Sequence, residues 1–406
     1  VVLAKTVIDA TGNADIAAAA GAECRYTGAG ELAMQGTGLP PRWLGATYTN
    51  TDYTITDETD LLDVWQLYVH AKNKFPAAFD LGQLIDTRER RMIVGEFTIT
   101  IPDQMAGRTY PDTIVQARSN YDTHGYIVAP YLLLKHPLRH IYTTYLPYRC
   151  LLPKGLEGIL VSGIGISAHR DAQPLVRMQP DVQNQGYAAG VAAAMAAKAG
   201  VEVRDINVRT LQKHLVEMGA LPQNVLTDKD SFPVGDKELA DAVGSIQDES
   251  QGLALVLAHP DRAIPLLEKA HAKAEGRVKV RYAKVLGMLG DPAAADTLIA
   301  EIKQARQWDA PPSWSIRKDY EGYRDVGWGM SHLDNTILAL GHTRSPEAVP
   351  VLVEKLKLLT PKAPFPHFRA VAMALELIGD ERAAGPLAAL LSQPEMGGYA
   401  QPSLAR

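Results

Sequence analysis

Cysteine is nearly absent from this chain of 406 residues, which contains only Cys24 and Cys150. Two thiols are too few for a four-thiolate iron–sulfur cluster or a cysteine-rich zinc site. They could form one disulfide, but we expect two separate buried or free thiols. The sequence also lacks the spacings typical of metal ligands, phosphate-binding P-loops and nucleophile elbows. We therefore predict no metal site in this chain.

Charge of one sign and long apolar runs are scarce as well. The formal net charge is -5, and the charged residues, 21% of the chain, form no basic block. Nucleic-acid binding needs a basic surface, so we expect no nucleic-acid partner. No apolar stretch approaches the roughly 20 residues of a membrane-spanning helix, so we expect no membrane partner. The first residue is valine rather than methionine, and the localisation stays open.

The remaining pattern divides the chain into regions. Residues 1–220 mix strand-like runs, glycines and one long helix rich in small residues, which predicts an α/β domain. Within it, residues 24–145 are rich in Tyr and Thr and predict an antiparallel sheet with one helix near residues 60–74. This part is the expected substrate subdomain. Residues 221–250 are polar and contain two prolines, which predicts a linker with one short helix.

From residue 251 onward the pattern is helical and repetitive. Four segments, each with a short polar turn before apolar residues at helical spacing, begin at His259, Gly290, Arg344 and Gly379. Amphipathic helices precede three of them. Paired helices with a period of roughly 30–40 residues are typical of an α-solenoid, and residues 251–396 resemble HEAT-like repeats. We expect a protein partner to bind through them.

One repeat is interrupted by residues 304–332, which carry three of the five tryptophans. An insertion into a solenoid repeat forms a loop on one face. The loop either recognises a partner through its aromatic side chains or packs onto its own solenoid, and we favour packing.

The opening strand-like run, Val7-Ile8-Asp9, leads into a turn with Thr11 and Gly12 and then into an alanine-rich helix over about 14–20. A glycine at this turn lets the backbone approach a ligand closely. We expect the helix to present unpaired N–H groups suited to an anion. Many strand–turn–helix units bind nothing, so this feature needs further support.

A second glycine turn follows a buried strand that begins near Gly158. The string GIGISA at residues 163–168 matches G-x-G-x-x-A. A dinucleotide-binding turn leads directly into a helix, whereas Pro174 and Pro180 follow here. We therefore reject a primary dinucleotide site and interpret the glycines as a close backbone approach.

A long helix is predicted to start near Asp181, after Pro180, and to stop at Gly200. Four small residues share one of its faces and would pack tightly against a backbone or a flat ring: Gly186, Ala189, Gly190 and Ala193.

Four motifs in residues 1–220 occur in a fixed order: VIDATGNADIAAAAGA, DTRERRMIVGEFTIT, YDTHG and LPYRCLLPKGLEGILVSGIGISAHRDAQPLVRMQPDVQNQGYAAGVAAA. Together they resemble the FAD-dependent oxidoreductase family that includes heterodisulfide-reductase-like flavoproteins. The resemblance implies a Rossmann-type domain with FAD as its cofactor, here followed by an all-α solenoid. In that family a strand with G-x-G-x-x-G precedes these motifs and holds the ADP pyrophosphate. This sequence lacks it, so we expect an incomplete domain whose missing part is a truncation or another subunit.

The resemblance implies seven cofactor-binding residues: Thr11, Gly12, Gly163, Gly165, Asp181, Gln185 and Gly186. The first two would lie near the ADP half of FAD, and the next two near the ribityl and phosphate groups. The last three would belong to a helix whose N-terminus points at the flavin N1–C2=O edge. A reduced flavin is anionic there, and a helix N-terminus carries about half a positive charge.

Substrate-side candidates follow the second glycine turn. His169 could move protons while the flavin takes hydride. Arg177 could hold a carboxylate or stabilise developing negative charge, and Arg170 lies between these two candidates. His124, in the YDTHG motif, is a third catalytic candidate. The alternative for each is a structural hydrogen-bonding role, which we favour for His124.

The Arg-rich motif contributes Arg88, Arg90 and Arg91, for which we also favour structural roles. We expect the last two to pair with Glu89 or Glu96.

These features predict an FAD-dependent oxidoreductase that transfers hydride between a small organic substrate and flavin. The alternative is a non-catalytic, protein-binding solenoid attached to a degenerate or partial flavin-binding scaffold.

Overall fold

The computed structural model describes residues 3–27, 33–44, 53, 56–84, 87–123, 125–135, 140–246, 250–310, 329–360 and 363–391. The chain divides into two compact units. The N-terminal unit comprises residues 1–126 and 137–234, and the helical unit comprises residues 127–136 and 235–406. No helix in these described ranges is long and apolar enough to cross a membrane.

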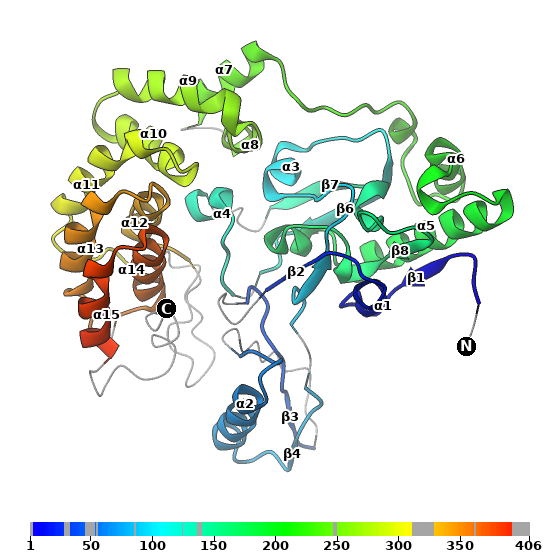
Figure 1. Cartoon of the computed structure of the whole chain (residues 1–406), viewed down its shortest axis with the longest axis horizontal. Helices are drawn as coiled ribbons and strands as arrows, with labels where there is room; N and C mark the ends of the chain where they lie inside the picture. Colours follow the sequence, from blue (N-terminus) through cyan, green and yellow to red (C-terminus); the bar gives the residue numbers. More distant parts are fainter. Residues whose placement is uncertain are drawn as a thin grey trace. The chain divides into compact units, whose positions relative to one another are not determined.

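A parallel pair of short strands, β1 (Val7–Asp9) and β8 (Ile159–Val161), organises the N-terminal unit (Figure 1). β1 leads into α1 (Asp15–Ala19), as the sequence predicts, and β8 leads into the 3-10 helix η2 (Gly163–Gly165). Because the strands are parallel, the turns that follow them lie at the same edge, where α/β proteins usually bind ligands.

The long helix α5 (Gln179–Ala199) packs against both strands and against η2. It begins two residues before the predicted start and ends, as predicted, at Gly200, whose φ is 69°. Two residues of the predicted small-residue face, Gly186 and Gly190, are exposed and do not pack tightly against the protein itself. Packing of this face against a flat ring stays a prediction. The buried stripe lies one residue earlier, about 100° around the helix, and consists of Gln185, Ala188, Ala189, Ala192 and Ala196.

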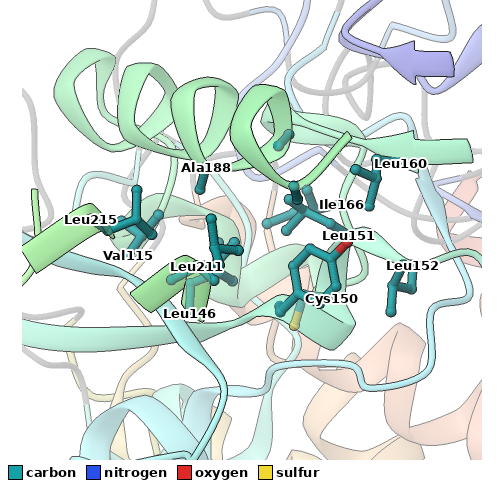
Figure 2. Packing of buried hydrophobic residues seen from close by; sticks show 14 of the residues in the cluster. Val115, Leu146, Cys150, Leu151, Leu152, Leu160, Ile166, Ala188, Leu211 and Leu215 are labelled. Carbon is teal, nitrogen blue, oxygen red and sulfur yellow. The ribbon is translucent and has the colours of Figure 1, made fainter. Parts of the chain in front are cut away.

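The core of the N-terminal unit lies among α5, α6 (Val208–Glu217) and the antiparallel hairpin of β6 (Thr113–Asn120) and β7 (Ile141–Pro147). Figure 2 shows Ala188 of α5 and Leu211 of α6 in this core. Cys150 is buried in the same cluster, and burial raises the pKa of its thiol. Cys24 and Cys150 are both free, as expected.

The predicted substrate subdomain contains further antiparallel pairs. β2 (Cys24–Tyr26) pairs with β5 (Arg91–Ile93), and β3 (Pro41–Arg42) pairs with β4 (Asp80–Leu81). The helix predicted near residues 60–74 is α2 (Leu61–Lys74), which begins where the Asp60 carboxylate accepts a hydrogen bond from the Leu62 amide. A short helix, α3 (Ile101–Ala106), follows β5.

The predicted linker contains one 3-10 turn, η5 (Gln223–Leu226), and one helix, α7 (Asp236–Ser245). α7 packs against the first helices of the helical unit, α8 (Ser250–Ala258) and α9 (Pro260–Lys273). The boundary between the two units falls at residues 234 and 235, inside the predicted linker.

The helical unit continues as helix pairs in two layers (Figure 1). One layer contains α10 (Gly276–Met288), α12 (His332–His342) and α14 (Phe365–Ile378), and the other contains α11 (Ala295–Gln304), α13 (Val349–Leu356) and α15 (Ala384–Leu391). The four repeated segments of the sequence are α9, α11, α13 and α15.

Two glycines allow the first layer to pack closely. A Cβ atom on Gly287 of α10 would lie 2.5 Å from the carbonyl oxygen of Ala339 in α12. A Cβ atom on Gly341 of α12 would lie 2.5 Å from the Cα atom of Ala374 in α14. Side chains at these positions would therefore push the helices apart.

Most of the predicted insertion, residues 311–328, lies outside the described residues, so its role stays a prediction. Its first part includes Trp308, whose Nε1–H donates to the Asp334 carboxylate at 2.7 Å. The indole ring also lies against His367, with a centroid distance of 4.9 Å. This tryptophan therefore packs onto its own helical unit, as the sequence favours.

One segment of the predicted substrate subdomain belongs to the helical unit. Residues 127–136 include α4 (Pro130–Leu134), which packs against α8 and α10. The Arg369 guanidinium of α14 donates to the Ile127 carbonyl at 2.7 Å. The chain thus supplies a piece of the helical unit from the middle of the N-terminal unit.

Candidate functional site

The buried carboxylate of Asp9 organises the turn between β1 and α1. Its Oδ1 accepts hydrogen bonds from the Thr11 amide at 3.0 Å and hydroxyl at 2.7 Å, and its Oδ2 accepts one from the Ala17 amide at 2.8 Å. Burial alone would raise the pKa of Asp9, but these hydrogen bonds outweigh it and lower the pKa. The Thr11 hydroxyl also accepts from the Asp15 amide at 2.8 Å.

These bonds correct one prediction. The first N–H groups of α1 do not stand open to an external anion, because Asp9 and Thr11 already bind the amides of Asp15 and Ala17. The Thr11 side chain is engaged inside the turn as well. A contribution of Thr11 to a cofactor site would therefore come from its backbone and from the shape of the turn.

The turns after β1 and β8 meet backbone to backbone. A Cβ atom on Gly165 would lie 2.9 Å from the backbone nitrogen of Ala14, so no larger residue fits there. Gly12 and Gly163 have φ values of 87° and 88°, in the left-handed region that favours glycine. A Cβ atom on Gly12 would contact the Ile164 side chain at 3.8 Å. These three glycines therefore lie together at the carboxyl edge of the strand pair.

Two buried glutamines hold the loop between η2 and α5. Gln185 accepts from the Gly163 amide at 3.1 Å and donates to the Val176 carbonyl at 2.7 Å. Gln173 donates to the Ile164 carbonyl at 2.9 Å. Since both ends of its amide are bonded and its side chain is fully buried, Gln185 would act on a cofactor by fixing the Gly163 turn. Gln173 is not among the residues predicted from the sequence, where its one signal is a polar residue between Ala172 and Pro174.

The first turn of α5 lies beside this loop. The Val182 side chain is 3.9 Å from the position of a Cβ atom on Gly163, and the Ser162 hydroxyl is 4.0 Å from one on Gly186. Asp181 is only 6% exposed, and its Oδ2 has no hydrogen-bond partner among the described residues. Burial raises the pKa of Asp181 to about 6, although a hydrogen bond from the Met178 amide acts to lower it. Its carboxyl group can therefore accept or donate near neutral pH.

His169 and Arg170 lie at the start of the 3-10 helix η3 (Arg170–Leu175). The His169 Nδ1 accepts a hydrogen bond from the Asp171 amide at 3.2 Å. Arg170 is buried, pairs with the Asp171 carboxylate at 3.2 Å and donates to the Tyr126 carbonyl. The contacts fix both side chains relative to this turn.

Arg177 belongs to a buried charge cluster. Its guanidinium donates to the Asp122 carbonyl at 2.9 Å and lies 3.4 Å from the Asp122 carboxylate. Its side chain is 7% exposed, and its Nε–H has no partner in the described ranges. Burial lowers the pKa of Arg177, while the charge of Asp122 opposes this shift.

Glu89 is an acidic member of this cluster, whereas the sequence predicts it only as an ion-pair partner. It is 1% exposed, and its Oε1 accepts from the Gln35 amide at 3.0 Å. Its Oε2 is buried without a partner in the described part of the chain. Burial raises the pKa of Glu89, whereas the charges of Arg170 and Arg177 lower it. Glu89 and two arginines thus share one low-dielectric environment.

The other arginines of the Arg-rich motif have structural partners, but not the predicted ones. Arg90 pairs with Glu58, and Arg91 pairs with Asp15 at 3.0 Å. Glu96 pairs instead with Arg204. Arg90 and Glu89 are adjacent in a turn before β5, and Arg90 pairs with a carboxylate 32 residues away in the sequence.

Arg88 lies near Arg177, and its charge contributes to the lowered pKa of Arg177. His124, the third catalytic candidate, lies outside the described residues, so its role stays a prediction. Where side chains are described, no group of three or more His, Cys, Asp or Glu residues could hold a metal ion.

Comparison with known proteins gives one match. Residues 54–215 match the model of the FAD dependent oxidoreductase family, which indicates an α/β oxidoreductase with FAD as the cofactor. The matched region contains the Arg-rich motif, β8, the Gly163–Gly165 turn, η3 and α5, while Thr11 and Gly12 precede it. No curated protein and no solved structure matches the chain.

The carboxyl edge of the β1–β8 pair fits such a cofactor. Gly12 and Gly163 are half-buried and carry no side chain, which allows a close approach by a flat or phosphorylated group. Gly165 is buried against Ala14 and contributes by letting the two turns meet. The 21-residue helix α5 adds an N-terminus whose N-cap residue, Met178, makes no side-chain cap hydrogen bond. The unpartnered Oδ2 of Asp181 adds a polar group at the same place.

Proposed function

We propose that this chain is an FAD-dependent oxidoreductase of the heterodisulfide-reductase-like type, which transfers hydride between flavin and a small organic substrate. The main observation behind this proposal is that Gly12, Gly163, Gly165 and the start of α5 lie together at one edge of the β1–β8 pair. The family match over residues 54–215 supports FAD as the group bound there. FAD, when bound, supplies the capacity to accept or donate hydride.

In this proposal the glycine turns hold the cofactor through their backbone. Gly12 would lie near its ADP half, and Gly163 and Gly165 near its ribityl and phosphate groups. The N-terminus of α5 would stabilise negative charge on the ring. Asp181 would form a hydrogen bond with a polar ring edge through its unpartnered Oδ2.

His169 is the proposed proton carrier. Its Nδ1 accepts a backbone N–H, so the neutral ring carries its proton on Nε2. The neutral ring can donate a hydrogen bond from Nε2 to a substrate atom. To pass a proton, the ring would first take up a second proton from water at Nδ1, releasing the Asp171 amide, and would then give its Nε2 proton to the substrate as hydride moves. Because the ring is half-buried, a substrate can approach it without unfolding the turn.

Arg177 is the proposed substrate-binding cation. Its buried Nε–H has no partner among the described residues and offers a charge-assisted hydrogen bond to a carboxylate. Glu89 offsets part of the positive charge of Arg170 and Arg177.

We further propose that the helical unit is a HEAT-like solenoid over residues 251–396. The supporting observation is the alternation of its helices between two layers. An experimental structure in which α10, α12 and α14 do not form one layer would contradict this proposal. The protein partner expected for such a solenoid stays a prediction.

The flavin proposal can be tested by titrating the full chain with FAD and recording the visible flavin spectrum. We expect a bound, coloured complex, and Gly163→Ala should weaken binding about tenfold. The matched control is Gly155→Ala, because Gly155 has a similar φ of 77° but no neighbour within 4 Å of its Cβ position. Both variants carry a similar backbone strain of about 1–2 kcal/mol, so only Gly163 should affect FAD.

A chain that stays colourless with FAD would contradict the proposal, and so would equal losses of affinity in the two glycine variants.

The FAD complex also allows a test of Arg177 as the substrate-binding residue. Succinate should perturb the flavin spectrum of the wild-type complex, and Arg177→Met should retain FAD while losing this response. A response that persists in Arg177→Met would remove Arg177 from the substrate site.

A further inference from the structure

A cavity of about 420 Å³ lies in the helical unit, and none of its described lining residues belongs to the proposed flavin site. It is bounded by α10, by the end of α11 and by the first residue of α12. Its lining residues are Arg277, Val280, Arg281, Glu301 and His332. The volume lies within the range of small-molecule sites in proteins.

The α10 wall is cationic. Arg277, Arg281 and Lys284 follow one another at spacings of four and three residues, which places them on one face of the helix. The two arginines are exposed at the cavity, whereas Lys284 is 7% exposed and lies behind it. The face therefore presents two guanidinium groups at the cavity and one ammonium beneath it.

Lys284 fixes the orientation of His332. Its Nζ donates to the His332 carbonyl at 3.1 Å and lies 3.2 Å from His332 Nδ1. Burial lowers the pKa of Lys284 to about 8, so it is mostly charged at neutral pH. An ammonium can only donate, so Nδ1 is the acceptor of this contact. In the neutral ring the proton consequently sits on Nε2.

The Nε2–H group of His332 is a donor at the cavity. Burial lowers the pKa of His332, and the charge of Lys284 lowers it further, so the ring is neutral at pH 7. The Glu301 Oε1 lies 3.6 Å from Nε2, which is longer than an ordinary hydrogen bond.

The second nearby acid does not face the cavity in the same way. Asp309 accepts from the amides of His332 at 2.8 Å and Leu333 at 3.2 Å, so it caps the start of α12. Both carboxylate oxygens are therefore directed at the helix backbone. Among the described residues that line the cavity, Arg277, Arg281 and His332 supply N–H donors, and Glu301 supplies a carboxylate.

We propose that this cavity binds a small organic anion that carries a carboxylate or phosphate group on a compact apolar body. Arg277 and Arg281 bind the anionic group, and the His332 Nε2–H adds a neutral donor. The aliphatic side chain of Val280 contacts the apolar body. Three helices bound the cavity, which suits a small molecule better than an extended acidic peptide.

The test uses the full chain in ligand-observed NMR titrations at constant ionic strength. The probes are phenyl phosphate, benzoate and benzyl alcohol, which share an aromatic ring and differ in charge. We expect at least one of the two anions to bind and benzyl alcohol to bind at least tenfold more weakly. Tighter binding of phenyl phosphate or of benzoate identifies phosphate or carboxylate as the preferred group.

Variants locate the binding. Arg277→Gln and Arg281→Gln should each weaken the preferred anion about tenfold. Lys279→Gln is the matched control, because this lysine is on the same helix and does not line the cavity. Anion binding that is unchanged in both arginine variants would overturn the proposal. Binding of hexaglutamate that requires Arg277, without binding of either aromatic anion, would overturn it in favour of a peptide site.

Discussion

At the scale of single residues, Asp9 and Asp181 show how hydrogen bonding decides the charge of a buried carboxylate. Asp9 accepts hydrogen bonds from backbone amides and from the Thr11 hydroxyl, and its pKa is lowered. Asp181 has one oxygen without a partner among the described residues, and burial raises its pKa to about 6. Asp9 is therefore a fixed structural anion, and Asp181 changes charge near neutral pH.

The stability of the N-terminal unit should depend on pH through Asp181. Its pKa is about 6 in the folded chain and about 3.9 in an unfolded one, so folding takes up a proton between these values. Its stabilising contribution is complete below about pH 4 and is lost as the pH rises through about 6. Asp181→Asn should therefore raise the thermal midpoint at about pH 8 by a few degrees and have little effect near pH 4.

Thermal scans of both proteins across this pH range provide the measurement. Asp205→Asn is the control, because it makes the same substitution at an exposed position. A difference between Asp181→Asn and wild type that stays constant from about pH 4 to pH 8 would rule out the titration of Asp181 as its cause.

At the scale of elements, the loop from β8 to α5 is held by contacts distant in sequence. Gln173 and Gln185 bind carbonyl and amide groups of this loop, and Gly165 touches the start of α1. The loop is therefore fixed by its neighbours rather than by regular secondary structure. Such a loop can present backbone groups to a cofactor with little reorganisation.

Gly165→Ala should destabilise the N-terminal unit by about 1–3 kcal/mol. Its Cβ atom would lie 2.9 Å from the Ala14 nitrogen and 3.0 Å from the Ala14 Cβ, and neither atom can move without shifting the backbone. Gly190→Ala is the counterpart, because Gly190 is exposed inside α5, and no atom of the described residues outside the helix backbone lies within 4 Å of its Cβ position. It should stabilise by about 0.5–1 kcal/mol.

Denaturant unfolding of the two variants measures both changes in the free energy of unfolding. Changes of the same sign in Gly165→Ala and Gly190→Ala would refute the close approach of the two turns.

At the scale of the whole molecule, the chain order does not follow the division into units. Residues 127–136 interrupt the N-terminal unit and pack with the helical unit, where Tyr131, Leu132 and Leu133 are buried. The stability of the helical unit therefore depends on a segment more than a hundred residues away from most of its sequence.

Leu132→Ala should destabilise the helical unit by about 2–5 kcal/mol, because it leaves a cavity beside α8 and α10. Hydrogen exchange followed by mass spectrometry should show faster exchange in α8 and α10 and unchanged exchange in the β6–β7 hairpin. Leu62→Ala, at a position that is 71% exposed on α2, should change neither. Faster exchange confined to the hairpin would contradict the assignment of α4 to the helical unit.

Local patterns predicted much of this architecture. The spacing of apolar residues located α2, the helix pairs from α9 onward and the stop of α5 at Gly200, because helix periodicity and glycine caps act over a few residues. The two glycine turns were also predicted, since a left-handed φ favours glycine over other residue types.

Other features depended on tertiary structure, because the hydrogen-bond or ion-pair partner of a side chain can be distant in the sequence. Three contacts join residues that local patterns do not connect. They are the hydrogen bonds from α1 amides to Asp9 and Thr11, the ion pair of Arg90 with Glu58, and the contact of Lys284 with His332. The sequence by itself determined where the helices and the glycine-containing turns occur, since backbone propensities are local. Only the tertiary structure decided which polar groups are buried, which are already bonded and which stay open to a ligand, because burial is a property of the packed chain.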